Sequence, residues 1–172
     1  MTGRGQPRRP AGNPVDRARA LGDELVRIHD SLRTDLKRIR REIDSYSGDI
    51  GTRPTELRAH CAAFCLALTK HHTSEDATAF PILREEFGEL APLLDQLEQD
   101  HHMVADIVRR VQRLLEELTP ENTERMKGEL DGLAAILESH FQWEERRLVE
   151  AFNALDEASR PTEDFFGIPA PR

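Results

Sequence analysis

Two pairs of side chains in this sequence have the spacing of metal ligands on a helix. His71 is followed by Glu75, and His140 is followed by Glu144. Residues i and i+4 of an α-helix lie on one face, a single turn apart, so each pair offers an imidazole nitrogen and a carboxylate oxygen to the same point in space. With further histidines from other helices, two such pairs could hold two metal ions that share carboxylate bridges.

The competing interpretation is that these are ordinary residues of a helical protein. A lone histidine in an apolar stripe is more often a hydrogen-bonded core residue than a ligand. However, burying two glutamates without a countercharge costs on the order of several kcal/mol, and a divalent cation removes that cost. We therefore predict a metal site built from four histidines and two glutamates, namely His29, His71, Glu75, His101, His140 and Glu144.

Four amphipathic helices would have to position these groups. Apolar residues recur mostly at three- and four-residue steps over about 14–46, 54–87, 92–118 and 120–152, and no strand-like alternation of useful length is present. Pro81 falls inside the second pattern and should kink or loosen its last turns. Thr119 is a suitable N-cap for the fourth helix, with Pro120 in its first turn. The pattern predicts an all-α protein, an up-down-up-down antiparallel four-helix bundle.

The length of 172 residues suits a single domain. We expect a disordered Gly-, Pro- and Arg-rich tail over 1–14, the bundle over 15–158 and a C-terminal tail over 159–172. Phe165 and Phe166 in that last tail are expected to dock either on the bundle or on a partner.

The histidine positions are consistent with one layer across such a bundle. Facing residues of an antiparallel hairpin lie equally far from its turn, so the midpoint between them must fall in the turn. The midpoints between successive histidines fall near residues 50, 86 and 120, which coincide with the turn signals at Gly48–Gly51, Phe87–Gly88 and Pro120. The four imidazoles are therefore predicted to meet at one level inside the bundle.

Composition argues against several other classes of protein. The net charge of −8 disfavours a nucleic-acid partner, and no apolar run approaches the length that would span a membrane. The N-terminus lacks an apolar segment of signal-peptide type, so we expect a cytoplasmic protein, with a monomer favoured. Cys61 and Cys65 are interpreted as small core residues.

The ligand set narrows the choice of metal. Mixed imidazole and carboxylate ligands suit iron, zinc or manganese. A single tetrahedral zinc would leave two buried groups spare. A ferritin-like site would need two Glu-x-x-His motifs, and this chain has only Glu98-x-x-His101. Two octahedral irons fit the set better.

The order of the motifs resembles the hemerythrin-like, or HHE, cation-binding family. It runs from His29 through HHTSE at 71–75 and DH at 100–101 to HFQWE at 140–144, and AFPIL at 79–83 and EERRL at 144–148 add to the likeness, which covers roughly residues 20–155. Members of that family are four-helix bundles with a non-haem di-iron centre. The resemblance implies that His29 and His71 hold one iron and His101 and His140 the other. It also implies that the two irons are bridged by Glu75 and Glu144 and by an oxo or hydroxo group.

One departure from the oxygen-carrying members affects the expected chemistry. They place a further histidine four residues after the third ligand histidine, where this chain has Ala105, so one iron lacks a protein ligand. His72 and His102 are expected behind the ligands or at the surface, while His60 and Tyr46 lie too far along their helices. We expect water or substrate to occupy this open coordination position.

An additional open position favours turnover of small oxidants over reversible oxygen carriage. The leading hypothesis is a di-iron protein that binds dioxygen, hydrogen peroxide or nitric oxide, with peroxidase- or catalase-like turnover in oxidative or nitrosative stress defence. The first alternative is an oxygen- or iron-sensing module without turnover. The second is a structural bundle without metal.

Overall fold

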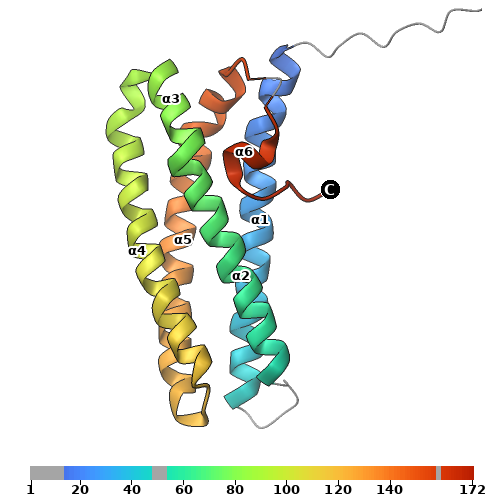
Figure 1. Cartoon of the computed structure of the whole chain (residues 1–172), viewed down its shortest axis with the longest axis vertical. Helices are drawn as coiled ribbons and strands as arrows, with labels where there is room; N and C mark the ends of the chain where they lie inside the picture. The colour runs from blue at the N-terminus through green and yellow to red at the C-terminus, as the bar shows by residue number, and fades with distance from the viewer. Residues whose placement is uncertain (1–13, 48–53, 158–159) are drawn as a thin grey trace, which may run out of the picture.

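The computed structural model describes residues 14–47, 54–157 and 160–172, and within these ranges every regular element is a helix. Four long helices lie side by side in Figure 1, with bounds α1 Pro14–Ser47, α2 Pro54–Ser74, α4 Ala91–Glu116 and α5 Pro120–Ala154. The prediction of an all-α protein is confirmed, and the four predicted segments correspond to the long helices and their extensions.

The four long helices surround one core. Helix α1 packs against α2 and α5, and α4 packs against α5 and α2, so each helix has two neighbours in the ring. The apolar stripes predicted from the sequence point inward, with Leu25, Ile28, Leu68, Leu97 and Leu133 all at most 1% exposed. Burial of such stripes, more than helix propensity, stabilises helices of this kind.

The second predicted helix is interrupted at the point where it reaches the candidate ligands. A π-helical turn, η1 Glu75–Ala79, follows α2, and α3 Phe80–Glu86 continues the segment. In the π-turn the backbone N–H of Phe80 donates to the carbonyl of Glu75, five residues earlier. Pro81 has no N–H, and it lies in the first turn of α3, where no donor is needed. The disturbance expected at Pro81 thus takes the form of a widened turn.

Helix boundaries follow the predicted signals. The Thr119 hydroxyl accepts a hydrogen bond from the backbone N–H of Asn122 at 3.3 Å, and Pro120 opens α5, as predicted. A short 3₁₀ turn, η2 Gly88–Leu90, joins α3 to α4. The predicted turn at Gly48–Gly51 and the predicted tail up to residue 13 lie outside the described residues.

The C-terminal segment docks on the bundle. Helix α6, Thr162–Phe166, packs against α1, α2 and η1 (Figure 1). The side chains of Phe165 and Phe166 are fully buried. Gly167 has φ +72°, and a Cβ there would lie 2.2 Å from the carbonyl oxygen of Lys70 on α2, so only glycine allows this close approach. The sequence left open whether the two phenylalanines dock on the bundle or on a partner, and the structure shows them docked on the bundle.

None of the described helices combines the length and the apolar character needed to cross a membrane.

Candidate metal centre

The structure brings the six predicted side chains together in the middle of the bundle. His29 comes from α1, His71 from α2, Glu75 from the π-turn, His101 from α4, and His140 and Glu144 from α5. All six are at most 4% exposed.

The first group of ligand atoms comes from α1, α2, η1 and α5. One nitrogen or oxygen from each of His29, His71, Glu75 and Glu144 lies within 4.8 Å of the others. His71 Nε2 is 3.2 Å from Glu75 Oε1, the i, i+4 pair expected from the sequence, and His29 Nε2 is 3.1 Å from Glu144 Oε2. Two imidazoles and two carboxylates are therefore directed at one point.

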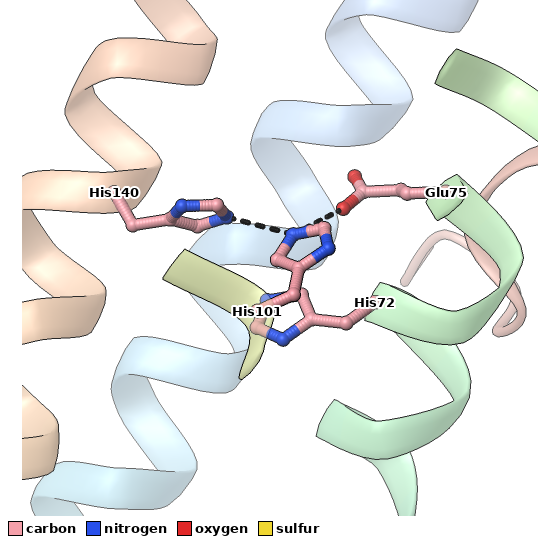
Figure 2. A group of neighbouring side chains, drawn as sticks. All are labelled: His72, Glu75, His101 and His140. Atoms are coloured by element: carbon pink, nitrogen blue, oxygen red, sulfur yellow. Dashed lines mark hydrogen bonds and ion pairs between the residues drawn. The ribbon is translucent and has the colours of Figure 1, made fainter. Parts of the chain in front are cut away.

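The second group contains His72, Glu75, His101 and His140, again within 4.8 Å of one another. Figure 2 shows the imidazoles of His101 and His140 and the carboxylate of Glu75 turned toward one another, with His101 Nε2 at 3.4 Å from Glu75 Oε2. Glu75 thus offers one oxygen to each group. Glu144 also approaches the second group, because its Oε2 lies 3.5 Å from His140 Nε2.

Oxygen acceptors around the centre fix the orientation of its imidazoles. Nδ1–H of His71 donates to the carbonyl of Phe166 in α6 at 3.1 Å. Asp76 and Asp100 accept from Nδ1 of His101 and His140 at 2.7 and 3.2 Å. Such outer hydrogen bonds leave Nε2 as the unprotonated, lone-pair nitrogen directed inward, which is the usual arrangement of metal-binding histidines.

The fourth imidazole, that of His29, is held by a partly buried carboxylate that is paired with an arginine. Nδ1 of His29 lies 3.0 Å from Glu145 Oε1, and Arg33 Nη1 donates to the same oxygen at 2.8 Å. Burial alone would raise the pKa of Glu145, but the hydrogen bonds from His29 and Arg33 lower it. The carboxylate therefore stays charged and keeps the His29 ring oriented.

The inward-facing atoms of the described site lack hydrogen-bond partners. Both carboxylate oxygens of Glu75 and of Glu144 are buried and unpartnered, as is Nε2 of His29 and of His71. Nε2 of His101 and Nε2 of His140 lie only 3.0 Å apart. Since both rings donate through Nδ1, their neutral forms direct two lone pairs at each other. Buried polar atoms are normally satisfied, and a cation is the partner that this set of lone pairs fits.

The close packing of these buried groups shifts their pKa values in the metal-free site. Burial, reinforced by the charge of Glu144, holds the pKa of Glu75 well above 4.5. Burial also lowers the pKa of His71 to about 3, with His29 adding repulsion. Burial opposes the ionisation of Glu144 as well, yet His140 and His29 lower its pKa below the ordinary value. The pKa values of the two carboxyls are thus shifted in opposite directions, as for two acids that share one small volume.

Sequence reasoning missed two contributors to the site. His72 was expected behind the ligands or at the surface. It is instead 6% exposed, and its Nε2 is buried without a partner among the second group. The carbonyl of Phe166 was missed because the position of the C-terminal segment was left open. By contrast His102 is exposed, and His60 lies away from the centre with its Nδ1 2.7 Å from Glu42.

Comparison with known proteins gives one match. A family model described as the Hemerythrin HHE cation binding domain matches residues 20–163, which is most of the chain. Searches of curated proteins and of solved structures found no match.

Proposed function

We propose that this chain, which belongs to the hemerythrin HHE cation-binding domain family, is a non-haem di-iron protein that binds and turns over small oxidants. The observation that carries the proposal is the pair of buried ligand groups that share Glu75, with unpartnered lone pairs directed at two neighbouring points. In this proposal the four long helices form an up-down-up-down antiparallel bundle, as in the prediction from the sequence.

The donor set fits two iron ions. His29 and His71 would hold one iron, His101 and His140 the other, and Glu75 and Glu144 would bridge them. Bound iron would supply Lewis acidity and redox chemistry toward dioxygen, hydrogen peroxide or nitric oxide. The two glutamates would balance much of the charge of the cations in a site where water is scarce.

The surroundings of the centre limit access by water. Four core side chains lie three residues along the chain from a candidate ligand histidine, and each is at most 2% exposed: Leu32, Leu68, Val104 and Leu137. An apolar lining favours small, weakly polar molecules over bulk water and larger substrates. We therefore place the protein in oxidative or nitrosative stress defence. We also place it in the cytoplasm, where the free thiols of Cys61 and Cys65 would remain reduced.

Iron analysis together with optical spectroscopy tests the proposal. Protein purified after expression with ample iron should contain about two irons per chain, and its spectrum should change on addition of hydrogen peroxide or nitric oxide. The variant Glu75→Gln removes the carboxylate shared by both groups and should lose most of the iron. The variant His60→Ala, which removes an imidazole outside the centre, should retain it. Wild-type protein that holds no iron and reacts with neither oxidant would contradict the proposal.

One contact favours a sensing role as the second candidate. The hydrogen bond from His71 to the Phe166 carbonyl joins a candidate ligand to the C-terminal helix α6. Iron occupancy that changes the position of the His71 ring would alter the docking of this segment, and so its contacts with a partner. Sensing without turnover predicts a difference in hydrogen exchange over residues 160–172 between iron-loaded and metal-free protein, and no catalytic consumption of peroxide.

A further inference from the structure

We infer that His72 is a seventh protein ligand of the metal centre and completes the coordination of the second metal ion beside His101 and His140. The inference rests on the proposed di-iron function, because it assigns a role within the same centre. It concerns a side chain that the sequence pattern left outside the ligand set.

The first support is the burial of the imidazole. His72 is 6% exposed, and its Nε2 is fully enclosed with no hydrogen-bond partner among the described residues. An unpaired buried nitrogen costs free energy, on the order of 1–3 kcal/mol, unless something binds it. A surface histidine or an ordinary core histidine would be expected to have a partner.

The second support is the position of this nitrogen donor. His72 offers a ligand atom within 4.8 Å of those of Glu75, His101 and His140, the same three side chains that form the second group. Figure 2 shows His72 reaching in from α2 to lie against His101. The two rings are stacked with centroids 3.9 Å apart, and the ring of His140 lies edge-on to His72 at 5.2 Å. Three imidazoles, one from each of three helices, therefore lie together.

The third support is that residue 105 of α4, one turn after His101, supplies no ligand atom. Ala105 lies one helical turn after His101 and lines the same pocket of about 140 Å³ as His72 and His101. A methyl group cannot coordinate a metal. A longer side chain at residue 105 could fill the space beside His101. Instead, His72 approaches this space from the neighbouring helix α2.

The number of imidazole ligands then differs between the two positions. With His72 included, the second metal ion would have three imidazoles and the first would have two, besides the two glutamates proposed to bridge them. The two metal ions would then differ in coordination number and in reactivity.

Removal and relocation of the imidazole test the assignment. The variants His72→Ala and His72→Gln should each lose iron from the second position, so that iron falls from about two to about one per chain and the optical spectrum changes. Adding Ala105→His to His72→Ala should restore part of the lost iron, because it supplies an imidazole to the same pocket from α4. His60→Ala, which removes an imidazole outside the centre, is the control and should bind iron like the wild type.

The outcomes separate this inference from the proposed function. If wild-type protein binds two irons and both His72 variants also bind two with an unchanged spectrum, the inference is wrong and the di-iron function stands. If the wild type binds none, both fail. If neither His72 variant folds, a crystal structure of the iron-loaded wild type decides. His72 Nε2 should lie about 2.1 Å from a metal ion, near the usual metal–imidazole distance, and a separation beyond about 3 Å would overturn the assignment.

Discussion

The acidic residues next to the candidate ligands are the outer supports of the centre. Asp76 follows Glu75, Asp100 precedes His101, and Glu145 follows Glu144. Each of these three accepts a hydrogen bond from Nδ1 of a different imidazole. A negative charge behind an imidazole raises the basicity of its inner nitrogen and holds the ring in position.

Asp76→Asn should therefore weaken metal binding about 10- to 100-fold, the usual effect of losing such an outer partner. Asp76 makes the shortest of these contacts, 2.7 Å to His101, and asparagine keeps the shape but loses the charge. The measurement is the dissociation constant for Fe²⁺, obtained by competition with a chromophoric chelator. Asp106→Asn, an exposed acid on α4 that pairs only with Arg109 among the contacts described for it, is the control. Equal effects of the two substitutions would show that Asp76 has no special role.

Metal binding should release protons and weaken as the pH falls. In the metal-free chain burial holds the pKa of Glu75 well above 4.5, so this carboxyl keeps its proton in a range where an exposed glutamate is ionised. A coordinating carboxylate must be deprotonated, and the metal therefore displaces the proton. Calorimetric titration in two buffers with different ionisation enthalpies should show proton release, and the dissociation constant should rise as the pH is lowered from neutrality. An affinity that is independent of pH would refute this.

For individual residues, the sequence predicted that the six side chains converge, but it did not predict the contacts of His72. Helical spacing paired His71 with Glu75, and equal distances from the turns placed the histidines at one level. The same spacing misplaced His72, because a rotation of about 100° from His71 points away from the expected ligand direction on an isolated helix. Only the position of α4 beside α2 makes that direction face His101, and a single helix carries no information about its neighbour.

Among the elements, helices α1 and α5 approach each other closely at Gly22. A Cβ on Gly22 would lie 2.9 Å from the backbone oxygen of Val149 and 2.5 Å from Oδ1 of Asn153, so the absence of a side chain allows the two helices to approach. On α5 itself, Gly132 is exposed and a Cβ there would meet nothing within 4 Å. The two glycines therefore differ in what they contribute to the packing.

Substituting alanine at each position should change stability in opposite directions. Gly22→Ala should lower the free energy of unfolding by about 1–3 kcal/mol, the usual cost of overpacking against atoms that cannot move freely. Gly132→Ala should raise it by about 0.5–1 kcal/mol, because alanine restricts the unfolded chain and suits a helix interior. Urea unfolding followed by circular dichroism measures both values. A stabilising Gly22→Ala would mean that α1 and α5 can separate at little cost.

The π-turn shows where prediction of elements from sequence reaches its limit. Pro81 signalled a disturbance in the second predicted helix, since it has no N–H to donate. The sequence alone could not distinguish a kink from a widened turn, because that choice depends on packing: Phe80 and Leu83 are fully buried on one side of α3. The widened turn affects the metal centre, because Glu75 and Asp76 both lie within it.

For the whole molecule, the metal centre and the stability of the fold are linked. The bundle surrounds the centre on four sides, and α6 supplies the Phe166 carbonyl that holds His71. Without metal, the core contains four unpartnered carboxylate oxygens from Glu75 and Glu144. A cation that binds only the folded chain stabilises it, by about 2.7 kcal/mol at a free concentration 100 times its dissociation constant.

Glu75→Gln should separate the contribution of this residue to the stability of the metal-free fold from its contribution to metal binding. Burial raises the pKa of Glu75 and so favours its neutral form, and a neutral amide of the same size should leave the metal-free melting temperature at or above that of the wild type. The same substitution removes the carboxylate shared by both metal positions. Anaerobic Fe²⁺ should therefore raise the melting temperature of the wild type by roughly 5–10 °C, given about 2–4 °C per kcal/mol for a chain of this size, and leave the variant almost unchanged. Differential scanning calorimetry with and without chelator measures both values. A metal-free variant that melts far below the metal-free wild type would show that the carboxyl supports the fold itself, because the buried acid would then be stabilising without any cation.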